Sequence, residues 1–235
     1  MTGARLRLLI LVFVAVLAGL LLLGVTRQHR PAEKPKLLLL TSLPLVFGEQ
    51  FSIEGGGSPA LQALQSRYGV LPISVTSPAE LAKGPLLLMA HPPAQTPENL
   101  VALDEWVRGG GRVLLLADPM LEWPSSRPLG DPLRPPPMFM DTGLLGHWGL
   151  KLDAPDRRGP EVRRLGGVDV LTVSPGTLSG KCDVSADRLV ADCRLGKGRA
   201  TVIADADLLD TQDLGSGTSH NLDGLLAELA RLQPN

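Results

Sequence analysis

The hydrophobic residues form one long run near the N-terminus and several short runs further along the chain. The long run, from Leu8 to Val25, has 18 residues without a charged or strongly polar side chain. A helix of that length rises about 27 Å, close to the thickness of a bilayer core. The run continues into Thr26 and Arg27 without the small-residue cleavage site of a signal peptide. The pattern therefore predicts an uncleaved transmembrane helix.

The residues after this run are polar and basic, and Pro31 and Pro35 interrupt them, which is typical of a linker. We predict a tail and anchor over residues 1–30, a linker over 31–35 and one domain over 36–235. Positive charges flank the apolar run on both sides, so the positive-inside rule does not decide its orientation. Because such a short N-terminal tail usually stays in the cytoplasm, we expect a single-pass protein of the inner membrane with residues 31–235 on the extracytoplasmic side.

The short apolar runs alternate with helical patterns. Five runs predict strands: Lys36–Thr41, Val70–Val75, Pro85–Ala90, Arg112–Ala117 and Ala200–Ala204. They are continuous rather than alternating, which is typical of strands covered on both faces. A hydroxyl residue followed by proline precedes three of the helical patterns, as at a capped helix start. Strands separated by capped helices predict a parallel sheet.

The stretch from Leu165 to Ala206 is rich in strand-forming residues. It predicts three more strands, at Val168–Val173, Leu178–Asp183 and Arg188–Arg194. We expect them to form a small antiparallel extension beside the parallel sheet. A last helix, from about residue 221 to 232, places its leucines on one face and should pack on the sheet.

Three segments carry a family resemblance: Thr96 to Asp118, Leu195 to Asp210, and His220-Asn221 at the start of the last helix. Together they resemble the glutamine-amidotransferase-like domain of the GldG family and related membrane-anchored DUF4350-type domains. Members of the GldG family are auxiliary components of uncharacterised ABC-type transport systems. The resemblance implies an α/β, flavodoxin-like (class I glutamine-amidotransferase-like) sandwich in the cell envelope without established catalytic activity. It also implies an envelope protein or transporter subunit as partner.

Composition and charge narrow the function classes. The chain has 23 Lys and Arg against 24 Asp and Glu, a net charge of -1, so no basic stripe favours nucleic-acid binding. An amidotransferase needs a cysteine on the turn after a buried strand, but that turn reads Ala117-Asp118-Pro119. No G-x-S-x-G elbow is present either. We therefore expect no catalysis and no cofactor.

Polar side chains gather at the expected carboxyl edge of the sheet, where ligands bind in open α/β folds. They are Asp118, Asp205 and Asp207, with His91 after the third strand. These residues either cap the following helices, hold a divalent metal for hydrolysis, or contact a nonmetal ligand. The leading hypothesis is a non-catalytic, membrane-anchored binding or scaffolding domain of the cell envelope. The alternatives are a metal-dependent hydrolase that uses these carboxylates and a sugar or small-anion sensor.

The stretch from Asp118 to Asp141 holds seven of the 21 prolines. Proline restricts the backbone, so the loop is stiff, and it is either a rigid cover or a binding surface. Its candidate binding residues are Trp123, Arg127, Arg134 and Phe139. We expect partner binding to be dominated by this loop.

The two cysteines, Cys182 and Cys193, flank a predicted hairpin turn at Asp187-Arg188. If the turn is centred there, the cysteines face each other across two antiparallel strands, near disulfide distance. They are either bonded to each other or two small buried apolar residues. Because a disulfide is favoured outside the cytoplasm, we predict the bond.

Overall fold

The computed structural model describes residues 3, 13, 34–47 and 57–233. Contacts divide the chain into two units, Met1–Lys34 and Pro35–Asn235. Only the second unit, called the domain below, is described in enough detail to discuss. Apart from Phe13, the predicted transmembrane run lies outside the described residues.

Among the described residues, no helix is long and apolar enough to cross a membrane. The longest of them, α4 (Pro97–Gly109), has 13 residues and rises about 20 Å, well short of a bilayer core. The predictions of a single span, an inner-membrane location and an extracytoplasmic domain therefore find no support in the described part of the chain.

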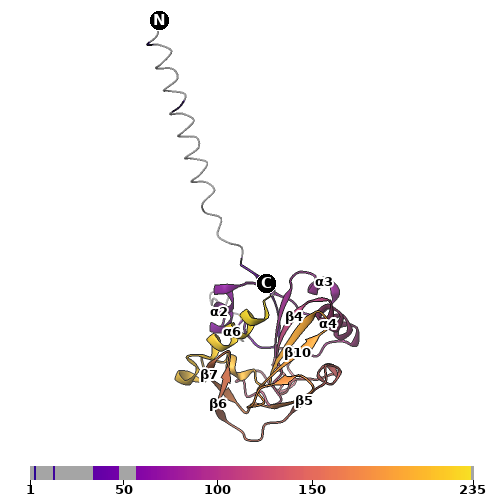
Figure 1. Ribbon diagram of the computed structural model, residues 1–235. Helices are drawn as coiled ribbons and strands as arrows, with labels where there is room; N and C mark the ends of the chain where they lie inside the picture. The colour runs from indigo at the N-terminus through magenta and orange to yellow at the C-terminus, as the bar shows by residue number, and fades with distance from the viewer. Residues whose placement is uncertain (1–2, 4–12, 14–33, 48–56, 234–235) are drawn as a thin grey trace. The chain divides into compact units, whose positions relative to one another are not determined.

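Seven strands form the main sheet (Figure 1). In spatial order they are β2 (Gly69–Pro72), β1 (Lys36–Thr41), β3 (Leu86–Ala90), β4 (Arg112–Leu116), β11 (Gly198–Ile203), β10 (Val190–Leu195) and β9 (Asp183–Val184). The first five pair in parallel, and β10 and β9 add to them in antiparallel fashion. The central strands are continuous apolar runs because both of their faces are buried.

Helices cover this sheet. They are α2 (Pro59–Arg67), α3 (Pro78–Leu81), α4, α5 (Leu144–His147) and α6 (Asn221–Leu232), with short 3-10 turns η1 (Asp207–Leu209) and η2 (Gly215–Thr218). Three start as the sequence predicts: the hydroxyls of Ser58, Ser77 and Thr96 each accept a first-turn amide, and a proline follows. Helices α2 and α6 contact each other, as do α3 and α4 (Figure 1).

Further strands pair outside the main sheet. Strand β5 (Leu150–Asp153) pairs with β8 (Thr177–Gly180), and β6 (Pro160–Leu165) pairs with β7 (Val168–Val173). Six of the eleven strands in the described part therefore lie outside the parallel set. The predicted fold class, a parallel flavodoxin-like sandwich with a small antiparallel extension behind one transmembrane helix, is therefore wrong in its sheet architecture. The sequence pattern did not indicate β5 and β6, and the predicted strand at 178–183 is divided after Gly180 into β8 and β9.

The structure joins Cys182 to Cys193 in a disulfide, with Cα atoms 4.8 Å apart. Strands β9 and β10 pair Asp183 with Asp192, so the cysteines are the next facing positions in that register. The bond therefore fastens the outer end of the main sheet.

Strand β11 and helix α4 approach each other closely at Gly198. A Cβ atom at this position would lie 1.9 Å from the carbonyl oxygen of Val107 and 2.4 Å from that of Gly111. Only glycine allows β11 to lie this close to the end of α4.

Candidate functional site

Three buried aspartates stand at the carboxyl edge of the sheet. Asp118 follows β4, Asp205 follows β11, and Asp207 begins η1. All three side chains are excluded from solvent. We call them the aspartate cluster.

Main-chain amides surround Asp118. Its Oδ1 accepts a hydrogen bond from the amide of Met120 at 2.8 Å, and its Oδ2 accepts one from Ala206, also at 2.8 Å. These bonds tie the segment after β4 to the segment after β11. Asp118 therefore fixes the shape of the sheet edge.

The other two aspartates act in the same way. Asp205 accepts hydrogen bonds from the amides of Val173 at 3.0 Å and Leu208 at 2.8 Å. Asp207 accepts one from the amide of Glu122 at 2.9 Å. The cluster thus links the ends of three strands to the segment after β4.

Burial changes the ionisation of the cluster. It raises the pKa of Asp118 to about 6, although main-chain amides oppose the shift. It raises the pKa of Asp207 to about 8, with a further contribution from the charge of Asp118. The pKa of Asp205 is raised well above its usual range by burial and by the two neighbouring carboxylates. At neutral pH the cluster therefore retains protons.

His91 stands apart from the aspartates in its contacts. It follows β3 with φ 46°, is fully buried, and its Nε2 lies 2.9 Å from the carbonyl oxygen of Pro136. Burial lowers the pKa of this imidazole. In the described part of the chain, no three or more His, Cys, Asp or Glu side chains are arranged to hold a metal ion. The predicted set of metal ligands is thus engaged with the main chain instead.

Residues 119–140, called the proline-rich segment, lie over this edge. The amide of Phe139 donates to the carbonyl oxygen of Asp118 at 2.6 Å, which brings the two ends of the segment together. The guanidinium of Arg134 donates to the carbonyl oxygen of Arg127, and the half-buried ring of Phe139 packs against the core. Arg134 and Phe139 therefore brace the segment rather than extend from it.

The first half of the proline-rich segment borders a polar groove, called the Trp123 groove. Its volume is about 420 Å³. Its lining comes from four parts of the chain: Pro44, Ser58, Trp123, Pro124, Ser125, Ser126, Asp210, Gln212 and Asp213. Of these, sequence reasoning singled out only Trp123. The polar residues that follow β11 were a signal that could have extended the prediction to Asp210 and its neighbours.

The groove offers hydrogen-bonding groups of several kinds. The hydroxyls of Ser58 and Ser125 each accept a main-chain amide and can still donate their own protons. Asp210 is almost fully buried, and burial raises the pKa of its carboxyl. The exposed side chains of Gln212 and Asp213 stand at the rim.

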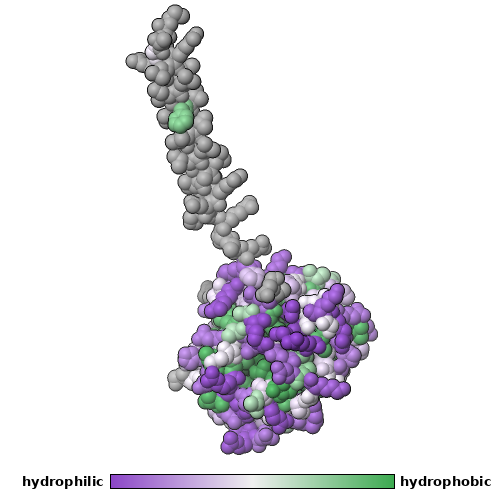
Figure 2. All heavy atoms as spheres, in the orientation of Figure 1, coloured by the Kyte–Doolittle hydropathy of each residue, from purple (hydrophilic) through white to green (hydrophobic). Residues whose placement is uncertain are grey.

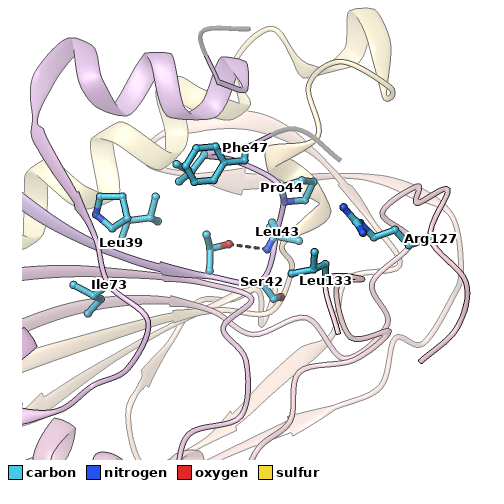
Figure 3. A pocket seen from close by; sticks show the side chains of 11 residues that line it. Leu39, Ser42, Leu43, Pro44, Phe47, Ile73, Arg127 and Leu133 are labelled. Atoms are coloured by element: carbon cyan, nitrogen blue, oxygen red, sulfur yellow. Dashed lines mark hydrogen bonds between the residues drawn. The ribbon is translucent and has the colours of Figure 1, made fainter. Parts of the chain in front are cut away.

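A second cavity of about 280 Å³, called the Leu133 pocket, lies beside β1. Figure 3 shows Arg127 and Leu133 on one side of it and Leu39 and Ile73 on the other. Pro44 lines both this pocket and the Trp123 groove. The two cavities therefore adjoin at Pro44.

The face of the domain seen in Figure 2 is mostly hydrophilic, with small groups of hydrophobic residues. The net charge of the chain is -1, which does not favour a strongly charged partner.

No protein family and no curated protein matches this chain. Its fold is similar to part of an exo-β-1,4-mannosidase from Opitutaceae bacterium strain TAV5, with TM-score 0.54 and 12% identity. That match covers 90% of this chain but only 38% of the mannosidase. The fold is also similar to a cytoplasmic protein from Salmonella typhimurium, with TM-score 0.54 and 13% identity, over 85% of this chain and 100% of that one. At such identities the similarity concerns the fold alone.

These comparisons give no support to the assignment to an envelope transport system. The similar structures are described as an exo-β-1,4-mannosidase and a cytoplasmic protein. The predictions of ABC transport, GldG-like function and a cell-envelope role therefore find no support among them. The family resemblance itself, and an envelope or transporter partner, are not tested and stay predictions.

Proposed function

We propose that the domain binds a saccharide in the Trp123 groove. The observation that carries this proposal is the combination of one indole with hydroxyl, carboxyl and amide side chains in a single groove. An indole offers a large, rigid apolar face for the C–H face of a sugar ring. Sugar hydroxyls both donate and accept, and the serines, aspartates and Gln212 supply matching partners. The fold shared with part of a mannosidase supports the same ligand class.

The test is titration of the purified chain with methyl β-mannoside and β-1,4-mannobiose, followed by calorimetry or ligand-observed NMR. Trp123→Ala should weaken binding about tenfold or more, because truncating an aromatic anchor typically costs at least about 1–2 kcal/mol. The Trp123→Phe variant keeps part of the aromatic face, so its affinity for the sugars should fall less than that of Trp123→Ala. Leu129→Ala is the matched control, since Leu129 is on the same segment, 82% exposed, and lines neither cavity.

Thermal melts must accompany these titrations, because Trp123 also packs partly against the core. If Trp123→Ala melts like the wild type but binds the sugars equally well, the groove is not their site. If the wild type binds neither sugar, the proposal fails for this ligand class.

A second candidate is hydrolysis of the bound glycoside, favoured by the two carboxyls in the groove. Asp210 is buried with a raised pKa, and the nearby Asp213 is exposed. Glycoside hydrolysis uses such a pair, one carboxylic acid as proton donor and one carboxylate as base or nucleophile. Release of nitrophenol from p-nitrophenyl β-mannoside, abolished by Asp210→Asn, would establish it. If the chain binds the sugars but does not hydrolyse this substrate, hydrolysis is refuted and only the saccharide-binding function remains.

A further inference from the structure

The Leu133 pocket differs chemically from the groove beside it. Its walls are mainly aliphatic and aromatic side chains, including Leu39, Val46, Phe47, Ile73 and Leu133. Two of the larger ones remain open to solvent in the domain, Phe47 at 66% and Leu133 at 58% exposure. Covering such apolar surface is favourable for a ligand.

The hydroxyls in this pocket are already used within the protein. Thr41 donates to the carbonyl oxygen of Ala90 at 2.7 Å and accepts from the amide of Leu43 at 2.9 Å, the bond drawn in Figure 3. Ser42 donates to the carbonyl oxygen of His91 at 2.5 Å. These bonds leave the pocket floor apolar in character.

The single charged side chain stands on the wall formed by the proline-rich segment. Arg127 lies 3.6 Å from the carboxylate of Asp131, so an acidic partner of the same segment already balances its charge. The pocket therefore favours binding of an uncharged hydrocarbon group. Because Pro44 lines both the pocket and the Trp123 groove, a group in the pocket would lie close to a sugar in the groove.

We infer that the ligand is an amphiphilic glycoside whose sugar occupies the Trp123 groove and whose hydrocarbon aglycone occupies the Leu133 pocket. This inference rests on the proposed function, because the groove must first hold the sugar. It adds the chemical class of the group attached to that sugar. The proline-rich segment then supplies contacts to both halves of the ligand.

The experiment compares the full chain's affinity for methyl, butyl, hexyl and octyl β-mannosides, each kept below its micelle concentration. Burial of one methylene is worth about 0.8 kcal/mol, so affinity should rise by up to about fourfold for each carbon that enters the pocket. Leu133→Ser should flatten this dependence while leaving methyl β-mannoside binding unchanged. Leu129→Ser, the matched exposed position on the same segment, should keep the wild-type dependence.

The outcomes separate the two proposals. Equal affinity for methyl and octyl β-mannosides would overturn the aglycone site while the sugar site stands. A chain-length dependence that survives Leu133→Ser would also overturn it, because the hydrocarbon would then bind elsewhere. If methyl β-mannoside does not bind and Trp123→Ala changes the affinity for no member of the series, the proposed function itself fails.

Discussion

The clearest prediction concerns the pH dependence of stability. It is tested by replacing Asp207 with asparagine. Burial raises the pKa of Asp207 from 3.8 to about 8, so the folded domain holds a proton that the unfolded chain loses near pH 4. A raised pKa in the folded state means stability that is complete at low pH and is lost as pH rises through about 8. The amide side chain in the Asp207→Asn variant would keep an oxygen to accept the Glu122 amide but would not titrate.

The range from pH 6.5 to 8 keeps the contributions of His91 and Asp118 small, and comparison with Asp207→Asn isolates the effect of Asp207. His91, whose pKa is lowered by burial, is mostly neutral in both states above pH 6.5. Asp118, with a pKa of about 6, is mostly ionised in both states. Across this range, Asp207 alone should lower the unfolding free energy by about 1.5 kcal/mol, because the slope of about 1.4 kcal/mol per pH unit falls to half as Asp207 becomes half ionised near pH 8. The pKa of Asp205 is also raised, so Asp205 should likewise lower the unfolding free energy as pH rises.

The assay is urea unfolding at pH 6.5, 7.25 and 8, followed by circular dichroism. The wild type should lose stability along this series, and Asp207→Asn should lose about 1.5 kcal/mol less. The control is Asp169→Asn, because the Asp169 side chain is 64% exposed and pairs with Arg164 at the surface. Equal losses in wild type and Asp207→Asn would show that Asp207 is already ionised in the fold, and the burial argument would be wrong.

Two further predictions concern the scaffold. Replacing both Cys182 and Cys193 by alanine should cost about 3 kcal/mol, the loop-closure entropy for a separation of 11 residues. Urea unfolding with and without reductant checks this, since only the wild type should respond to the reductant. Gly198→Ala should cost about 3 kcal/mol or more, or prevent folding, because its Cβ would meet two carbonyl oxygens of the main chain. Gly109→Ala, which meets nothing within 4 Å, should melt no lower than the wild type, and equal melting of both variants would contradict the packing argument.

Local features of the fold were predictable from the sequence because they depend on neighbouring residues. The run Lys36–Thr41 is strand β1 as predicted, and Pro72 lies on the edge strand β2, where a missing amide does no harm. The capped helix starts follow from a hydroxyl residue and a proline. Each of these signals involves only a few neighbouring residues, so it can be recognised before the fold is known.

The candidate site was less predictable because it is assembled from distant segments. The sequence indicated that Asp118, Asp205 and Asp207 share one edge and that they could accept main-chain amides as caps, but not which amides they bind. The Trp123 groove needs Pro44 and Asp210 beside Trp123, a proximity that only the folded chain creates. The amphipathic patterns likewise did not show where glycine turns would divide the antiparallel strands.

The main-chain hydrogen bond between Phe139 and Asp118 closes the proline-rich segment at its base. Changes in length near the tip of the segment should therefore hardly affect the sheet. Gly130, with φ 88° and no atom within 4 Å of an added Cβ, marks the exposed tip. Closing a flexible loop twice as long costs only about 0.6 kcal/mol. The tip can therefore accept inserted residues while the scaffold that holds the segment stays the same.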